Sequence, residues 1–229
     1  CSNIDNIIVF LEDGRYIVTK IDNKKFIGHN IIYVSVWKKN DNHNIYNVVY
    51  KDGPSKISYV KRFAVTSLIR ERFYDITQSN ENSKILYLTS NRNSESEVIN
   101  LILNNKSNAK NKHLEYDFAN LSIKNKFSKG NILSKYPIKK ITQKYVGEST
   151  LGGVDIWLDE NIGRLNCENI GLYLGSFNSG DKIISFYNDG TYELTSFNFS
   201  NRYTMSDIKI VEKFQIDTTY TMLHYEGKS

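Results

Sequence analysis

Apolar and polar residues alternate over short runs along the chain, and tight-turn pairs separate these runs. Residues 6–21 read NIIVFLEDGRYIVTKI, which is two runs rich in β-branched and aromatic residues around Asp13-Gly14. Glycine reaches the positive φ that a tight turn needs, so this pattern predicts a β-hairpin. The same design recurs in residues 44–66 around Asp52-Gly53 and in residues 181–199 around Asp189-Gly190.

Weaker versions of the pattern predict further hairpins. Residues 83–103 have the same shape with Asn91-Arg92-Asn93 at the tip, and residues 153–167 form a looser copy. Residues 219–229 resemble the first half of another hairpin, and residues 25–39 predict an outer strand pair beside the first one. Residues 65–73 could form one helical turn, but between two hairpins they favour a connection.

The spacing of the hairpin tips predicts how the strands are organised. Tips near residues 13, 52 and 91 are about 39 residues apart, and those near 189 and 226 are about 37 apart. Four short strands per period are typical of a radial array of blades, which must stack because a lone blade cannot bury its faces. We therefore predict an all-β fold, residues 1–229 forming one domain of about five to six four-stranded blades, in a closed, open or truncated ring.

Length and composition limit the classes of protein to consider. The 229 residues can bury a sizeable core, no apolar run reaches the length of a membrane span, and the N-terminus does not resemble a signal peptide. The chain starts without methionine, so we expect a piece of a longer protein. Two cysteines, Cys1 and Cys167, fit a reducing cytoplasm.

Charge is distributed unevenly. The net charge is +5, but residues 104–144 hold ten lysines and two acids, whereas residues 145–229 hold six basic and twelve acidic residues. A basic centre of this kind predicts a surface for a polyanion. On charge alone, a solubilising face is an equal alternative.

No motif predicts catalysis or a metal site. The four histidines are scattered, Cys167 has no histidine nearby in sequence, and Gly130 and Gly152-Gly153 match no phosphate-binding loop. We predict no catalytic residue, no metal ligand and no cofactor in this chain. The lysines near Gly130 differ, because ammonium groups and backbone N–H donors together can hold a phosphate backbone without reading bases.

Several segments resemble the C-terminal domain of type IIA topoisomerase A subunits, the DNA gyrase and topoisomerase IV group. The resemblance covers nearly the whole chain, is most specific in residues 61–75, 128–141 and 149–160, and is closest to A subunits of the Bacteroidetes type. It implies a β-pinwheel, a propeller-like ring whose blades exchange strands and whose basic rim binds and bends DNA.

Residues 124–130 are similar to the gyrase box Q-R-R-G-G-K-G, which that family needs to wrap DNA. The match keeps the basic character but not the paired glycines, and it lies near the third blade instead of the first. We therefore expect DNA to be held and bent without gyrase-like wrapping. Lys124 takes the place of Gln, Asn125 and Lys126 of the two Arg, and Phe127 and Ser128 of the two Gly, while Lys129 and Gly130 align unchanged.

The resemblance implies an accessory domain with no catalysis of its own. The catalytic tyrosine would lie outside this chain, Mg²⁺ and ATP would be used elsewhere in the holoenzyme, and the partners would be duplex DNA and the topoisomerase B subunit. The expected location is the bacterial cytoplasm at the nucleoid, with no membrane contact. An alternative is a propeller that mediates protein–protein contacts through its acidic portion. A carbohydrate-processing or lectin propeller would need clustered carboxylates or a secretion signal, and the sequence has neither.

Two groups of basic residues are the predicted DNA contacts. For each residue, plain solvation is the alternative reading. The first group is Lys124, Lys126, Lys129, Gly130, Lys135, Lys139, Lys140 and Lys144, and the second is Lys61, Arg62, Arg70 and Arg72.

Overall fold

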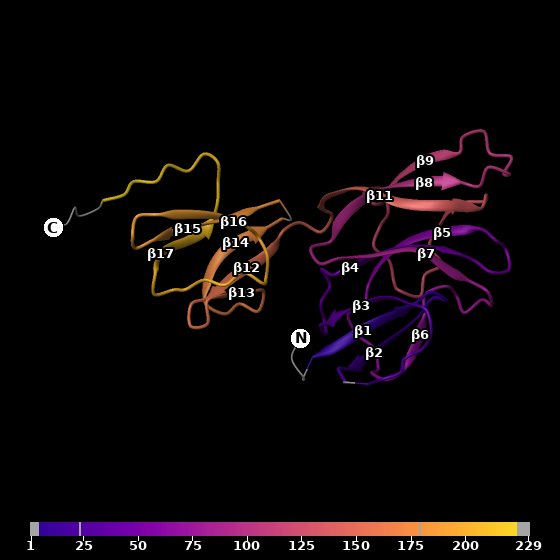
Figure 1. The fold of residues 1–229 in the computed structure, drawn as a ribbon, viewed down its shortest axis with the longest axis horizontal. Helices are drawn as coiled ribbons and strands as arrows, with labels where there is room; N and C mark the ends of the chain where they lie inside the picture. Colours follow the sequence, from indigo (N-terminus) through magenta and orange to yellow (C-terminus); the bar gives the residue numbers. More distant parts are fainter. Residues whose placement is uncertain (1–4, 23, 179, 224–229) are drawn as a thin grey trace. The chain divides into compact units, whose positions relative to one another are not determined.

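The computed structural model describes residues 5–22, 24–178 and 180–223, and within them the fold is β-sheet throughout (Figure 1). Seventeen strands form five sheets, and a single 3-10 turn, η1 (Phe118–Asn120), is the one helical element of these residues. The predicted all-β class is confirmed. Contacts divide the chain into two compact units, unit 1 (Cys1–Thr150) and unit 2 (Leu151–Ser229), which we describe separately.

Unit 1 contains three sheets. Sheet A has the strand order β3-β1-β2-β6, sheet B the order β10-β5-β4-β7, and sheet C the order β11-β8-β9. The strands are β1 (Asn6–Leu11), β2 (Arg15–Lys20), β3 (Ile31–Trp37), β4 (Ile45–Lys51), β5 (Ser58–Ala64), β6 (Phe73–Asp75), β7 (Lys84–Asn91), β8 (Glu95–Leu103), β9 (His113–Asp117), β10 (Asn131–Ser134) and β11 (Ile138–Ser149).

Unit 2 contains two sheets of three strands each. Sheet D has the order β13-β12-β14 and sheet E the order β16-β15-β17. Their own core includes Ile156, Leu158, Phe177 and Ile183, all fully buried. The strands are β12 (Val154–Asp159), β13 (Arg164–Asn166), β14 (Leu172–Phe177), β15 (Lys182–Tyr187), β16 (Tyr192–Ser196) and β17 (Ile208–Lys213).

Four of the predicted hairpins are present. The pairs β1–β2, β4–β5, β12–β13 and β15–β16 are antiparallel neighbours around the expected turns. In the first, Gly14 has a φ of +96°, and a Cβ there would lie 2.3 Å from the Thr77 methyl carbon, so both the backbone and the packing require glycine.

The hairpin predicted in residues 83–103 is wrong. β7 pairs with β4 in sheet B, whereas β8 pairs with β9 and β11 in sheet C. The turn at Asn91-Arg92-Asn93 therefore passes the chain from one sheet to the next. Of the outer strand pair expected in residues 25–39, one strand forms, β3. Residues 65–72 connect two strands. In the half-hairpin expected in residues 219–229, residues 219–223 form no strand, and residues 224–229 lie outside the described ranges.

Neighbouring sheets exchange strands, as the resemblance implied. The fourth strand of sheet A, β6, comes from between β5 and β7 of sheet B. The fourth strand of sheet B, β10, comes from between β9 and β11 of sheet C. A rudiment of the same exchange occurs in unit 2, where Arg202, between β16 and β17 of sheet E, bridges Arg164 of sheet D.

Sheet B lies between two cores in unit 1. One core joins sheets A and B through residues such as Phe10, Tyr16 and Tyr50, and the other joins sheets B and C through Val60 and Phe118. Six of the seven residues of β4 and of β5 are buried as a result. This double covering decides where the basic residues of β5 lie.

Candidate nucleic-acid interface

The lysine-rich residues 124–144, which we call the basic edge segment, follow the edges of two sheets. β10 is the outermost strand of sheet B, and β11 is the outermost strand of sheet C. The side chains of six lysines in this segment are exposed, so the predicted first group of contacts lies largely on the surface. They are Lys124, Lys129, Lys135, Lys139, Lys140 and Lys144.

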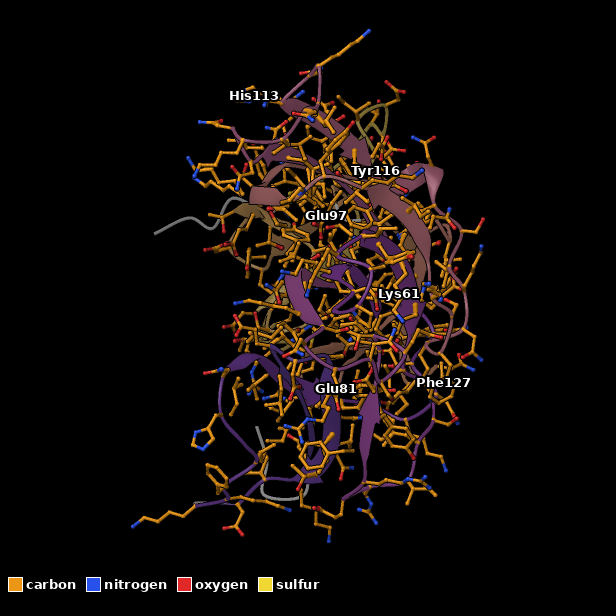
Figure 2. The ribbon with its side chains drawn as sticks, turned by 90° about the vertical axis from the view of Figure 1, so that its right-hand side faces the viewer. Lys61, Glu81, Glu97, His113, Tyr116 and Phe127 are labelled. Atoms are coloured by element: carbon orange, nitrogen blue, oxygen red, sulfur yellow. The ribbon has the colours of Figure 1, made fainter. Side chains whose placement is uncertain are left out.

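Residues 124–130, the arch, span a single residue of β5. The arch begins where the Lys124 amide donates to the Arg62 carbonyl at 3.0 Å, and it ends where Asn131 pairs with Val60. Lys61 lies between these two points on β5 and therefore underneath the arch. Figure 2 labels Lys61 and Phe127 on the same side of the view.

The Lys61 ammonium holds the arch from below. It donates to the carbonyl oxygens of Lys126 and Ser128 at 2.8 and 2.9 Å, and it lies over the rings of Tyr50 and Phe63. The side chain is 1% exposed, and burial lowers the pKa of Lys61 to about 8. A buried cation satisfied by two carbonyls and two aromatic faces fixes the path of the arch backbone.

Gly130 closes the arch against β5. Its φ is +89°, and a Cβ there would lie 2.5 Å from the Val60 carbonyl oxygen. The backbone that Gly130 approaches is therefore that of the protein's own strand β5. The glycine that ends the arch is therefore required by packing within unit 1.

Phe127 and Lys126 form the middle of the arch. The Phe127 ring is 53% exposed, and its centroid lies 6.5 Å from that of Tyr74 on β6. The Lys126 ammonium lies over both rings and donates to the Ser67 carbonyl, and burial lowers the pKa of Lys126. Lys126 is thus less exposed than the other lysines of the segment, because its ammonium packs against neighbouring residues. Phe127 has no positive φ, so the arch does not reproduce a glycine-pair conformation at that position.

Two of the exposed lysines have local partners. The Lys129 ammonium lies 4.7 Å from the centroid of the Tyr59 ring, and its hydrogen bond with the Tyr59 hydroxyl raises the pKa of Lys129. Lys144 forms an ion pair of 2.6 Å with Glu115, and this hydrogen bond raises the pKa of Lys144. Both side chains stay charged at neutral pH, which binding a polyanion requires.

The second predicted group of DNA contacts does not form the expected surface patch. Lys61 and Arg62 are each 1% exposed, so the prediction that they contact DNA directly is wrong. They point to opposite faces of β5, and sheet B is covered on both faces. Arg62 donates to the Asn47 side chain and to the carbonyl oxygens of Phe118, Ser94 and Glu95. This guanidinium ties sheet B to sheet C.

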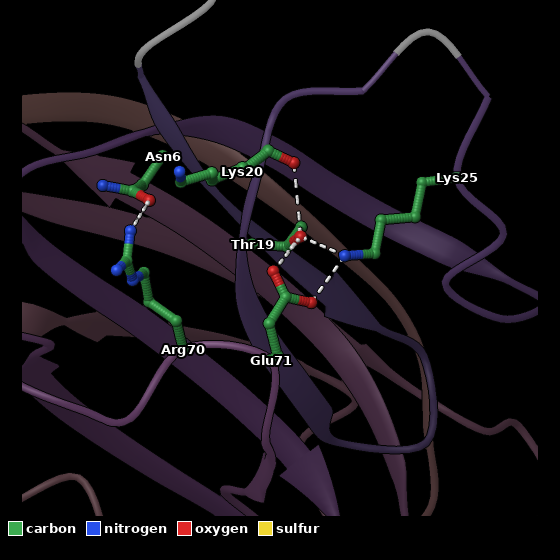
Figure 3. Close-up of polar contacts among 6 residues, drawn as sticks. All are labelled: Asn6, Thr19, Lys20, Lys25, Arg70 and Glu71. Atoms are coloured by element: carbon green, nitrogen blue, oxygen red, sulfur yellow. Dashed lines mark hydrogen bonds and ion pairs between the residues drawn. The ribbon is translucent and has the colours of Figure 1, made fainter.

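Arg70 and Arg72 are exposed beside β6. Arg72 lies over the Tyr74 ring, and Arg70 donates to the Asn6 side chain at 3.5 Å. Figure 3 shows the neighbouring network, in which Glu71 accepts hydrogen bonds from Thr19 at 2.7 Å and from Lys25. Glu71 therefore fixes the connection that carries the two arginines.

Exposed aromatic residues lie among these lysines, and the distribution of charge along the sequence does not indicate them. Phe127, Tyr136 and Tyr145 are 53%, 42% and 52% exposed. In the sequence they look like ordinary strand aromatics, and only their places on the arch, in the turn after β10 and on the edge strand β11 leave them uncovered. In the described part of the chain no group of His, Cys, Asp or Glu could hold a metal ion, and no helix there is long and apolar enough to cross a membrane.

A family model described as the topoisomerase C-terminal domain of Bacteroidota matches residues 2–145 and 164–229. The chain also matches two solved structures. One is the C-terminal domain of DNA topoisomerase IV, with a TM-score of 0.44, 12% identity and coverage of 92% of this chain and 79% of that chain. The other is the DNA gyrase A C-terminal domain, with a TM-score of 0.40, 11% identity and coverage of 94% and 84%. No curated protein sequence matches the chain. Because the family model covers most of its residues, the chain belongs to the Bacteroidota topoisomerase C-terminal domain family.

Proposed function

We propose that this domain binds and bends duplex DNA through the basic edge segment, without sequence preference. The observation that carries the proposal is the set of six exposed lysines in this segment, three of which lie on β11, the outer strand of sheet C. Ammonium groups that replace condensed counterions supply affinity that does not depend on base sequence. In a type II topoisomerase, a domain that holds a bent segment would present DNA for supercoiling, relaxation or decatenation. Catalysis, Mg²⁺, ATP and the B subunit would belong to the rest of the enzyme.

The same lysines have a simpler explanation as protection of sheet edges. Lysines on edge strands oppose pairing with another chain, and Lys139, Lys140 and Lys144 lie on β11, the outer strand of sheet C. The two explanations predict different behaviour with salt. DNA binding through phosphates weakens steeply as salt rises, whereas edge protection requires no affinity for DNA.

A titration with duplex DNA at several salt concentrations tests the proposal. We expect the logarithm of the affinity to fall linearly with the logarithm of salt concentration. The charge-reversal variant Lys139→Glu/Lys140→Glu should bind more weakly and reduce the slope by about two, because each lost phosphate contact removes about 0.9. Absent affinity, or affinity that does not change with salt, contradicts the proposal.

The matched control is the variant Lys182→Glu/Lys209→Glu. These lysines are exposed on strands of unit 2, and their reversal changes the net charge by the same amount. We expect the control to bind far more tightly than the variant in β11. Equal losses in the two variants would mean that net charge, and not the basic edge segment, determines binding.

A protein–protein contact module is the second candidate. Unit 2 carries six basic and eleven acidic residues, and β16 exposes Tyr192 and Leu194 at the edge of sheet E. An apolar edge in an acidic unit fits a protein partner better than DNA. Wild-type protein without salt-dependent DNA affinity would favour this candidate.

A further inference from the structure

We infer that Phe127 is a wedge that inserts between base pairs from the minor groove and kinks the bound duplex. This inference rests on the proposed DNA binding and adds a contact of a different chemical kind. The first observation is exposure. Phe10, Phe63, Phe118 and Phe177 are fully buried, whereas the Phe127 ring is 53% exposed at the middle of the arch; Phe26 and Phe73 are also exposed but lie outside the arch.

The arch backbone holds Phe127 in place. Three consecutive carbonyls are occupied: Lys61 bonds those of Lys126 and Ser128, and Gln78 donates to that of Phe127 at 2.7 Å. The Phe127 amide donates to the Asn125 side chain at 2.9 Å. A backbone fixed at so many points presents its side chain without an ordering cost on binding, which is what a wedge requires.

The ring is supported from within unit 1. The Lys126 ammonium lies 5.4 Å from the centroid of the Phe127 ring, and the centroid of the Tyr74 ring lies 6.5 Å from it. These neighbours prop the ring while half of its surface stays open to solvent. The arrangement differs from that of an aromatic side chain that only lies flat on the protein surface. The residues that hold Phe127 and its backbone come from β5, β6 and the connection after β6.

Cations flank the ring in the sequence of the arch. Lys124 and Lys129 are exposed before and after Phe127. An apolar side chain between cations is the chemistry of proteins that wedge a base step open from the minor groove, which bends the duplex by about 20–90°. Lysines on both sides can neutralise phosphates drawn together by such a kink. The chemistry thus selects duplex DNA as the ligand.

The test compares wild type with Phe127→Ala on a duplex of about 30 base pairs, long enough to show a kink of this size. Energy transfer between dyes at its ends measures the bend, and 2-aminopurine placed along the duplex reports unstacking. We expect wild type to bend the duplex and raise 2-aminopurine fluorescence. Phe127→Ala should lose most of both signals but keep the salt slope, because it removes no charge. Phe127→Trp should restore both signals.

Phe26→Ala is the matched control. Phe26 is another exposed phenylalanine of unit 1, 78% exposed, and it contacts His29 outside the arch. This variant should bend DNA as wild type does. Circular dichroism of each variant verifies that the fold is kept.

The outcomes separate the wedge from the proposed function. If wild type has no salt-dependent affinity for duplex DNA, both fail. If wild type binds but Phe127→Ala bends the duplex equally, the wedge is wrong and the electrostatic proposal stands. If Phe127→Ala weakens binding only to single-stranded DNA, the ring stacks on unpaired bases and the wedge is overturned.

Discussion

At the scale of single residues, Lys61 and Arg62 have different structural roles although they are adjacent on β5. Side chains alternate along a strand, so Lys61 faces sheet A and the arch, whereas Arg62 faces sheet C. Lys61 satisfies carbonyls of the arch, and Arg62 satisfies carbonyls near β8 and η1. Two buried cations thus position the segments on either side of sheet B.

The lowered pKa of Lys61 predicts a particular dependence of stability on pH. Burial lowers this pKa from 10.5 to about 8, although Asp75 opposes the shift. Between these two values the unfolded state binds more protons than the folded state, so stability rises with pH. A neutral amine still has two N–H donors for the two carbonyls. From about pH 7.5 to 9.5 we expect Lys61 to add about 2 kcal/mol to the free energy of unfolding.

Urea titrations of wild type and Lys61→Met at both pH values measure this contribution. The variant leaves two carbonyls without their donor and should be less stable at neutral pH. It should also lack the rise with pH that wild type shows. Parallel pH profiles for the two proteins would mean that Lys61 is not the titrating group.

At the scale of elements, the sequence predicts local pairs better than exchanged ones. Asp-Gly turns identify β1–β2 and β4–β5 because a two-stranded hairpin depends on neighbouring residues. The turn at Asn91-Arg92-Asn93 has the same local chemistry but joins two sheets. Only long-range pairing distinguishes the two cases, and strand alternation carries no information about it.

The same limit applies to the candidate site. Lysine content located the basic edge segment, since the cost of desolvating a charged side chain keeps most lysines on the surface, as it does for six lysines of this segment. It misplaced Lys61 and Arg62, because a strand covered on both faces usually reads as a continuous apolar run, and two adjacent cations inside β5 therefore indicate an exposed strand. The sequence shows that Phe127 replaces a glycine of the box, but it does not predict that the ring is exposed, since this exposure depends on the arch that Lys61 and Gln78 hold.

Gly130 allows the arch to be tested as an element. Gly130→Ala would combine an unfavourable φ with a Cβ 2.5 Å from the Val60 carbonyl oxygen. We expect a loss of about 2 kcal/mol in the stability of unit 1 and displacement of the arch. Faster tryptic cleavage after Lys124, Lys126 or Lys129 would report that displacement.

Gly152→Ala is the control for backbone strain. Gly152 has a similar φ of +84°, but a Cβ added there would meet no atom within 4 Å. This variant should leave cleavage at the arch lysines unchanged. If both variants expose the arch equally, close packing against Val60 is not what fixes it.

At the scale of the whole molecule, the two units differ in charge and in core. Unit 2 carries six basic and eleven acidic residues, so the net positive charge of the chain comes from unit 1. Each of the five sheets takes all its described strands from one unit, and each hydrophobic core cluster of the described residues does the same. Strand exchange links the sheets within a unit, so cooperativity should follow the units.

Independent unfolding of the two units is the prediction that follows. Leu158→Ala removes a fully buried side chain of the unit 2 core, and Ile8→Ala removes one of unit 1. Each should cost about 2–5 kcal/mol, because a cavity remains where the side chain was. Hydrogen exchange followed by mass spectrometry should show faster exchange across β12–β17 for the first variant and across sheets A, B and C for the second. If either variant accelerates exchange equally in both units, the domain unfolds as one body, and strand exchange does not define its cooperative units.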